Sequence, residues 1–278
     1  LKGVNAIYQK FPYPLENLSG GLYFDRERIV VTDVVASDTD RRIELDGKVT
    51  ERGTGRPVYH IRVDADGIPL DRTLWQALPE SHRVLAARFD AAGVVDVDAT
   101  VFTGDDGNDP LPISFAADAS IRDGSLQMDS WPVRLTNVSG RASITPGSAT
   151  IEDCVGYYRQ SEVHLAGGMQ FATTGTPAQY RLNLRTRRTP LDETVLGLLP
   201  ESMKRHVLAF RPEGAVDVGV DYEKADADEP ADYEISVACL GNRIDHERFP
   251  YPLHNVRGTV TLDVNAVTLH DIEAVPAL

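Results

Sequence analysis

The chain has 278 residues, enough for one large or two ordinary domains, and its hydrophobic (42%) and charged (25%) fractions are those of a folded protein. Its formal net charge of −14 disfavours a nucleic-acid binder, because phosphate recognition needs a basic surface. No apolar run approaches the ~18 residues of a membrane-spanning helix, and no signal peptide is present. The chain opens at Leu1 in the middle of a pattern, so we expect an internal segment of a longer protein.

A ten-residue string occurs three times along the chain. It reads "FPYPLENLSG" from Phe11, "WPVRLTNVSG" from Trp131 and "FPYPLHNVRG" from Phe249, at offsets of 120 and 118 residues. The sequence between these strings also repeats, since "PLDRTLWQALPES" from Pro69 recurs as "PLDETVLGLLPES" from Pro190. The sequence therefore predicts one continuous array of tandem repeats of about 120 residues. Its parts are the end of a preceding repeat (1–10), repeat 1 (11–130), repeat 2 (131–248) and the start of repeat 3 (249–278).

Apolar and polar residues alternate over much of each repeat, which predicts β-strands with one dry face and one wet face. The alternating segments are 59–65, 95–101 and 113–121 in repeat 1, and 180–184, 216–222 and 233–239 in repeat 2. Turn signals lie at 25–27, 38–40, 145–147 and 174–177. Because connections this short join neighbouring antiparallel strands, we expect antiparallel meanders.

The "PLD…LPES" stretch is the exception, since its apolar residues fall near helical spacing. It predicts one helical hairpin per repeat, at about 70–89 and 191–210. Asp71 and Asp192 are the expected N-caps. Pro79 and Pro200 suit the first turn of a second short helix.

The repeated string itself predicts a joint between modules. Proline cannot donate to a sheet ladder, so "FPYPL" is expected to be an extended crossing segment with few ladder bonds. The asparagine that follows is expected to form a turn, and a binding motif is the alternative interpretation of the string. Cys154 and Cys239 each replace an apolar residue of another copy, so we expect small buried hydrophobic residues rather than a disulfide.

The predicted dry face is larger than the predicted helices can cover. A dozen or more strands ~4.8 Å apart would make a continuous sheet ~60 Å wide, whereas one helix is ~10 Å across. Three solutions remain: each repeat closes as a barrel or sandwich, the sheet curls into a trough, or a ligand with long apolar chains fills the trough.

The order of the segments resembles the AsmA-like and TamB-like bacterial envelope proteins. The segments are "FPYPLxNLSG", "IVVTDVVA", "IELDGKV" at Ile43 to Val49, the "PLD…LLPE" piece and "GxVDVDxxV", with "LAGGM" ending Val163 to Met169 in the second copy. The resemblance implies a repeated, taco-shaped β-groove lined with apolar residues. It also implies phospholipid movement or homeostasis between the membranes of a diderm bacterium, a place in the cell envelope or periplasm, and a parent protein anchored in a membrane outside this segment. That family has no catalytic residues to transfer.

We therefore expect a mainly β fold, an elongated, curved antiparallel sheet forming a groove, with a short helical hairpin in each tandem repeat. The expected protein is non-enzymatic, with no cofactor, no metal and no nucleic acid, and its groove binds or conducts phospholipid acyl chains. The expected groove lining is Tyr59, Ile61, Val63, Val95, Val97, Val101, Ile113, Phe115, Ile121, Tyr180, Leu182, Leu184, Val216, Val218, Val220, Tyr233, Ile235 and Val237. The alternative is a structural or adhesive repeat stalk with closed β modules and no ligand. An enzyme or sugar-binding module is a third interpretation, but no group of polar residues repeats or converges, and the seven histidines form no metal-binding pair.

Overall fold

The computed structural model describes residues 1–9, 11–51, 57–78, 80, 83, 90–104, 113–127, 132–172, 177–199, 201–225, 231–246, 248 and 251–276, with only the backbone of 201–203. Strands account for 71% of the residues and helices for 8%, which confirms the prediction of a mainly β fold.

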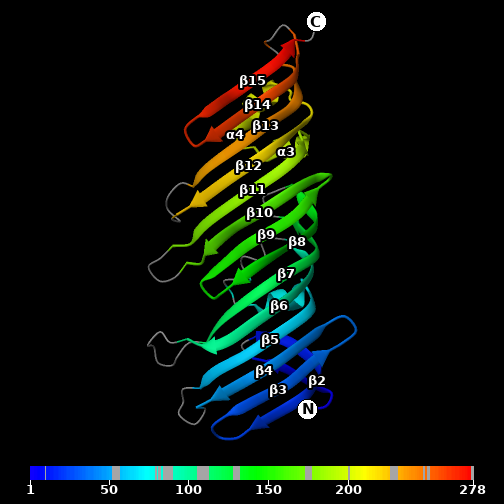
Figure 1. The fold of residues 1–278 in the computed structure, drawn as a ribbon, viewed down its shortest axis with the longest axis vertical. Coiled ribbons are helices and arrows are strands. Elements are labelled where there is room, and N and C mark those ends of the chain that lie inside the picture. The colour runs from blue at the N-terminus through cyan, green and yellow to red at the C-terminus, as the bar shows by residue number, and fades with distance from the viewer. Residues whose placement is uncertain are drawn as a thin grey trace. The chain divides into compact units, whose positions relative to one another are not determined.

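The elements follow one another in Figure 1 as strands interrupted by short helices. They are β1 (Val4–Tyr8), β2 (Phe11–Phe24), β3 (Ile29–Ser37), β4 (Arg42–Thr50), β5 (Val58–Pro69), α1 (Arg72–Ala77), β6 (Ala92–Thr103), β7 (Ile113–Gln127), β8 (Arg134–Ile144), β9 (Ser148–Tyr158), β10 (Ser161–Gln170), β11 (Gln179–Pro190), α3 (Glu193–Gly197), α4 (Glu201–Ala209), β12 (Ala215–Lys224), β13 (Asp232–Ile244), β14 (Leu253–Asp263) and β15 (Val267–Pro276).

Within the described residues, the strands form one antiparallel sheet of 15 strands in chain order, and this sheet does not close on itself. All six alternating segments lie in strands, namely in β5, β6, β7, β11, β12 and β13, as the alternation predicts. The turns expected at 25–27, 38–40 and 145–147 join neighbouring strands, whereas most of 174–177 lies outside the described residues. Asp25 and Asp38 each accept backbone N–H groups two and three residues ahead, the turn geometry that aspartate favours.

Contacts divide the chain into two compact units. Unit 1 comprises Leu1–Gly124 with Ser139–Thr150, and unit 2 comprises Ser125–Val138 with Ile151–Leu278. The repeat boundaries expected from the sequence stay a prediction.

The core of unit 1 lies beneath α1. The Asp71 carboxylate caps this helix as expected, accepting hydrogen bonds from the backbone N–H groups of Thr73 (2.8 Å) and Leu74 (3.0 Å). Ala77 belongs to a cluster of buried residues, and Leu70 and Leu74 pack against it. The strands supply the other members of that cluster, Tyr13, Leu18, Val34, Ala36, Ile43, Ala65, Ile68 and Val95. Most of 79–89, including Pro79, lies outside the described residues.

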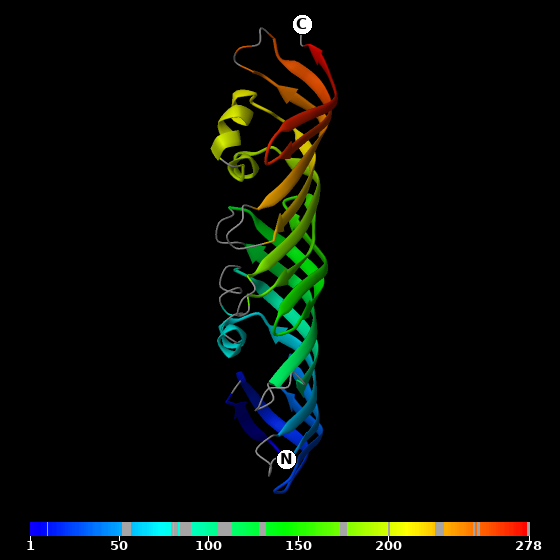
Figure 2. The ribbon, with the colours of Figure 1, turned by 90° about the vertical axis from the view of Figure 1, so that its left-hand side faces the viewer.

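Two short helices, α3 and α4, follow β11 in unit 2. The Asp192 side chain caps α3 as expected, accepting from the Val195 N–H (2.9 Å), and also accepts from the Tyr158 hydroxyl (3.1 Å). Figure 2 shows α3 and α4, in yellow, to one side of the strands of unit 2. Pro200 lies outside the described residues.

Two β-bulges lie 121 residues apart, one in each unit. The register of β5 shifts between Ala65 and Ile68, and there the Gly67 N–H donates to Asp96 Oδ1 (2.9 Å). The register of β11 likewise shifts beside Arg188, whose N–H donates to Asp217 Oδ1 (2.8 Å). Gly67 and Arg188 both have positive φ, 72° and 53°. In both units an aspartate on the next strand satisfies the N–H that the bulge frees.

In the first copy "FPYPL" is extended, as expected, but it belongs to a paired strand rather than to a crossing segment, and its number of ladder bonds stays a prediction. There the segment begins β2 and pairs with β1, with Phe11 opposite Tyr8 and Pro14 opposite Ile7. The pairing tolerates the prolines because its register shifts twice, and a proline fits where no N–H is required. In the third copy β14 begins at Leu253, after both prolines.

We expected the repeated asparagine to form a turn between strands, and this expectation is wrong. Asn17, Asn137 and Asn255 lie inside β2, β8 and β14, with φ values of 54°, 49° and 51°. The pairing of β2 with β1 and of β14 with β15 shifts register beside these residues. Because asparagine tolerates the left-handed region, it makes a bulge in a continuous strand.

Candidate functional site

Two rows of largely apolar side chains cross unit 2 from β10 to β15. Residues directly opposite each other in an antiparallel pair place their side chains on the same face, so the registers define the rows. The first row is Leu165, Leu184, Val220, Ile235, Leu262 and Val267. The second row is Val163, Thr186, Val218, Val237, Val260 and Leu269. These residues form the apolar face of unit 2.

This apolar face is only partly shielded from water. In the first row Leu262 is the buried member, four others are half-buried, and Val267 on β15 is 61% exposed. Burial also falls along β12. Val216 follows closely after α4 in the sequence and is 2% exposed, whereas Val218 and Val220 are half-buried. The described part of unit 2 thus leaves apolar surface in contact with solvent.

The opposite face of unit 2 is charged. Arg181 pairs with Glu223 across β11 and β12 (2.8 Å), and Arg185 pairs with Asp221 (2.8 Å). Asn183 donates to the same Asp221 carboxylate. These groups are solvated, so the sheet of unit 2 has one wet face and one apolar face.

Unit 1 has an apolar face of the same kind. Away from α1 one row contains Leu22, Val31, Gly47, Ile61 and Val101. Leu22 is 44% exposed and the other apolar members are half-buried. The next row toward the helix, which begins with Val34, is anchored in the buried cluster. Burial in unit 1 therefore concentrates beneath α1.

Most residues of the expected groove lining are half-buried. Val95 and Val216 are buried, and Leu182 is 38% exposed. The half-buried residues are Tyr59, Ile61, Val63, Val97, Val101, Ile113, Phe115, Ile121, Tyr180, Leu184, Val218, Val220, Tyr233, Ile235 and Val237. The registers of β5–β6 and of β11–β13 bring the expected residues of those strands onto one face in each unit. Ile121 of β7 packs against the buried cluster of unit 1. Their role as a groove lining stays a prediction.

Sequence reasoning missed the part of the apolar face that β14 and β15 contribute. Val260 and Leu262 alternate with Thr259, Thr261 and Asp263, and this pattern could have identified β14. On β15 the alternation is short, since it covers Val267 to Leu269 before the polar His270 and Asp271.

Neither cysteine forms a disulfide, as we expected. Cys154 and Cys239 are half-buried, less buried than expected, and burial raises the pKa of both thiols above the usual value. Such thiols react slowly, because the thiolate is the nucleophile.

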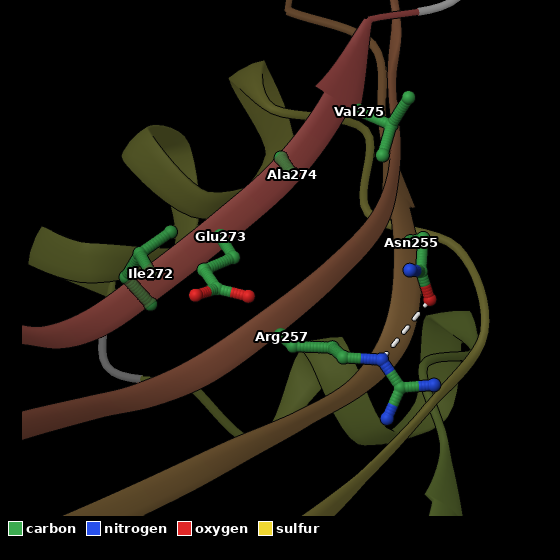
Figure 3. Close-up of a pocket in the computed structure, with 6 residues that line it drawn as sticks. All are labelled: Asn255, Arg257, Ile272, Glu273, Ala274 and Val275. Atoms are coloured by element: carbon green, nitrogen blue, oxygen red, sulfur yellow. Dashed lines mark hydrogen bonds between the residues drawn. The ribbon is translucent and has the colours of Figure 1, made fainter.

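A depression of about 460 Å³ lies on β14 and β15, lined by Asn255, Arg257, Ile272, Glu273, Ala274 and Val275 (Figure 3). Arg257 Nε donates to Asn255 Oδ1 there (3.1 Å). The lining is exposed, mixes polar with apolar residues and includes no residue of the two apolar rows, so we place the candidate site on the apolar faces.

In the described part of the chain, no three or more His, Cys, Asp or Glu side chains are grouped as a metal site would need. The helices that the structure describes are all too short or too polar to cross a membrane.

No protein-family model matches the chain, and no curated protein or solved structure shows significant similarity to it.

Proposed function

We propose that this protein is a non-enzymatic component of the bacterial cell envelope or periplasm whose apolar sheet faces bind, and in the parent protein conduct, the acyl chains of phospholipids. The observation that carries the proposal is the first apolar row of unit 2, from Leu165 to Val267. It crosses six strands without a polar side chain, yet most of its members are half-buried or exposed.

Free energy favours an apolar occupant over water on this face. Each square ångström of apolar surface removed from water contributes about 25 cal/mol, and each buried methylene of a lipid chain about 0.8 kcal/mol. Acyl chains need no directional hydrogen bonds, so a face of valine, leucine and isoleucine can hold them at many positions. Binding of this kind requires no catalytic group.

The dimensions of the face suit a lipid tail. From Val216 to Tyr222 on β12 is six residues, or ~20 Å at ~3.3 Å per residue. The acyl chains of one leaflet span about half of a ~30 Å hydrocarbon core. One chain therefore fits along the strands between the helix end of unit 2 and the opposite end.

The correspondence between the units supports a tandem array like that of the AsmA-like and TamB-like proteins. The N-caps Asp71 and Asp192 and the bulges at Gly67 and Arg188 each lie 121 residues apart. In an array of this kind each repeat would present an equivalent apolar face.

The proposal is tested by lipid extraction. The chain is expressed in a bacterial host, purified without detergent, extracted with organic solvent, and the extract is analysed by mass spectrometry. We expect phospholipid to copurify, and we expect Ile235→Asp to lower its amount about tenfold by placing a carboxylate in the first row.

Ser236→Asp is the matched control, because it adds the same charge to the same strand on the wet face, where Ser236 lies opposite Gly219 and close to the Arg185 side chain. We expect it to retain the lipid. An extract of folded wild-type protein without lipid would refute the proposal and favour the ligand-free stalk.

A further inference from the structure

Three tyrosines and a lysine gather at one end of the apolar face of unit 2. Tyr180 on β11 lies directly opposite Lys224 on β12, and Tyr222 on β12 lies directly opposite Tyr233 on β13. Tyr222 and Lys224 are two residues apart on one strand, so all four side chains share a face. All four are half-buried. We call these residues the tyrosine–lysine rim.

The rim lies at the ends of the strands remote from α3 and α4 in the chain. β11 begins next to Tyr180 and runs toward α3, and β12 leaves the helical segment and ends at Lys224. Eight residues, or ~26 Å of extended strand, separate Lys224 from the buried Val216. The rim therefore lies at the end of the apolar face opposite the buried Val216.

The polar atoms of the rim have no partner within the described part of the protein. Neither the Lys224 ammonium nor the hydroxyls of Tyr180, Tyr222 and Tyr233 make a hydrogen bond or ion pair there. The arginines of the opposite face differ, since Arg181 and Arg185 are both held by carboxylates. The ammonium of a half-buried lysine at the edge of an apolar surface offers three donors to a ligand bound on that surface.

We propose that the rim binds the phosphate of an anionic phospholipid whose acyl chains lie on the apolar rows of unit 2. The inference rests on the proposed function and adds the class of lipid, its orientation and its headgroup contacts. Tyrosine suits a boundary between apolar and wet surroundings, because its ring is apolar and its hydroxyl is polar. In the proposed complex the Lys224 stem lies along the apolar face while its ammonium makes charge-assisted hydrogen bonds to phosphate oxygens.

The rim is a property of unit 2. At an offset of 121 residues Tyr180 corresponds to Tyr59 of unit 1, but Lys224 corresponds to Thr103. Thr103 is already engaged, since its hydroxyl accepts a hydrogen bond from the Tyr59 N–H (2.7 Å). Among the described residues, unit 1 therefore has no cation at the position equivalent to Lys224, and we assign the headgroup contact to unit 2.

The test compares two fluorescent lipids with identical acyl chains, phosphatidylglycerol and diacylglycerol, which differ by the anionic phosphoglycerol headgroup. Binding of each to the full chain is measured for wild type, Lys224→Ala and Lys48→Ala. Lys48 is exposed and lies opposite His60, on the wet face of unit 1, so its substitution removes the same charge from a surface outside the site. Inorganic phosphate alone is titrated in a parallel arm.

We expect wild type and Lys48→Ala to bind phosphatidylglycerol about tenfold more tightly than diacylglycerol, and Lys224→Ala to lose that preference while still binding diacylglycerol. Equal affinity of wild type for both lipids would overturn the headgroup assignment and leave the proposed function standing. Binding of neither lipid would overturn both. Saturable binding of inorganic phosphate that Lys224→Ala abolishes would assign the rim to a soluble anion and overturn the lipid assignment.

Discussion

Val216 and Val220 lie on the same face of the same strand four residues apart, yet Val216 is buried and Val220 is half-buried. This difference in burial shows that the apolar face of unit 2 is covered at one end and partly exposed at the other. One end contributes to stability and the other remains available to a ligand.

The two valines should therefore respond differently to truncation. Val216→Ala removes two buried methyl groups and leaves a cavity, so we expect the free energy of unfolding to fall by about 1.5–3 kcal/mol. Val220→Ala should cost less than about 1 kcal/mol in lipid-free protein, since its side chain already contacts water. Urea denaturation at 25 °C measures both values. Equal losses would show that the whole face is packed as a core.

Asn242 should be a strong determinant of stability. Its side chain is 3% exposed, accepts from the Leu240 N–H (2.9 Å) and donates to the carbonyls of Ala215 (3.0 Å) and Glu213 (3.2 Å). Asn242→Ala leaves these backbone groups unpaired, so we expect a loss of about 1–3 kcal/mol in the free energy of unfolding. Asn265→Ala, at an exposed position with ordinary backbone geometry, is the comparison, and an equal loss there would contradict a special role for Asn242.

The Asp96 carboxylate should make the free energy of unfolding depend on pH. Hydrogen bonds from Arg122 and from the Gly67 N–H lower the pKa of Asp96 below its usual value. A lowered folded pKa stabilises the protein above the unfolded pKa of ~3.9, and this stability is lost as the pH falls through the folded value. Arg122 is exposed, so solvent screening keeps the contribution of this ion pair to the free energy of unfolding at about 1 kcal/mol.

Denaturation of wild type and Asp96→Asn at several pH values measures this contribution. The wild type should be more stable than the variant at pH 7, and the difference should shrink below about pH 4. A difference independent of pH would exclude the ionised carboxylate as its source.

The two bulges should respond oppositely to a change of residue type. A Cβ at Gly67 would lie 2.1 Å from the Asp40 carbonyl oxygen, so Gly67→Ala should lower the free energy of unfolding by about 1–3 kcal/mol. Arg188 occupies the equivalent bulge at a φ of 53°, which costs a non-glycine residue about 1 kcal/mol. Arg188→Gly should thus leave stability unchanged or raise it slightly. Thermal unfolding of both variants tests the pair, and destabilisation by Arg188→Gly would contradict the prediction.

The strands were predictable because half-buried antiparallel strands alternate apolar and polar residues, as Tyr180 to Leu184 do. The caps Asp71 and Asp192 were predictable because a side-chain acceptor directly before a helix has a local geometric role. The pairing of the first proline string was not predictable, because its partner β1 lies in residues 1–10, which we assigned from the sequence only to the end of a preceding repeat. The asparagine bulges were missed because residues that favour turns also favour left-handed positions inside strands.

The candidate site was predictable only in part. Alternation identified which residues share a face, but not that Val95 would be buried beneath α1 while Ile61 stays half-buried, because cover depends on tertiary packing. Lys224 escaped notice since the sequence shows a lysine ending an alternating strand, a common position for a solvated charge. Its register opposite Tyr180 places it at the end of the apolar rows.

The most direct measurement is photo-crosslinking from adjacent residues on opposite faces of β12. A photoreactive phenylalanine analogue is placed at Val220 or at Asp221, and the purified chain is irradiated with vesicles of radiolabelled phospholipid. The apolar-face account predicts strong labelling from position 220 and background labelling from position 221, because successive side chains of a strand point to opposite faces. Equal labelling from both positions, or none from position 220, would contradict the account.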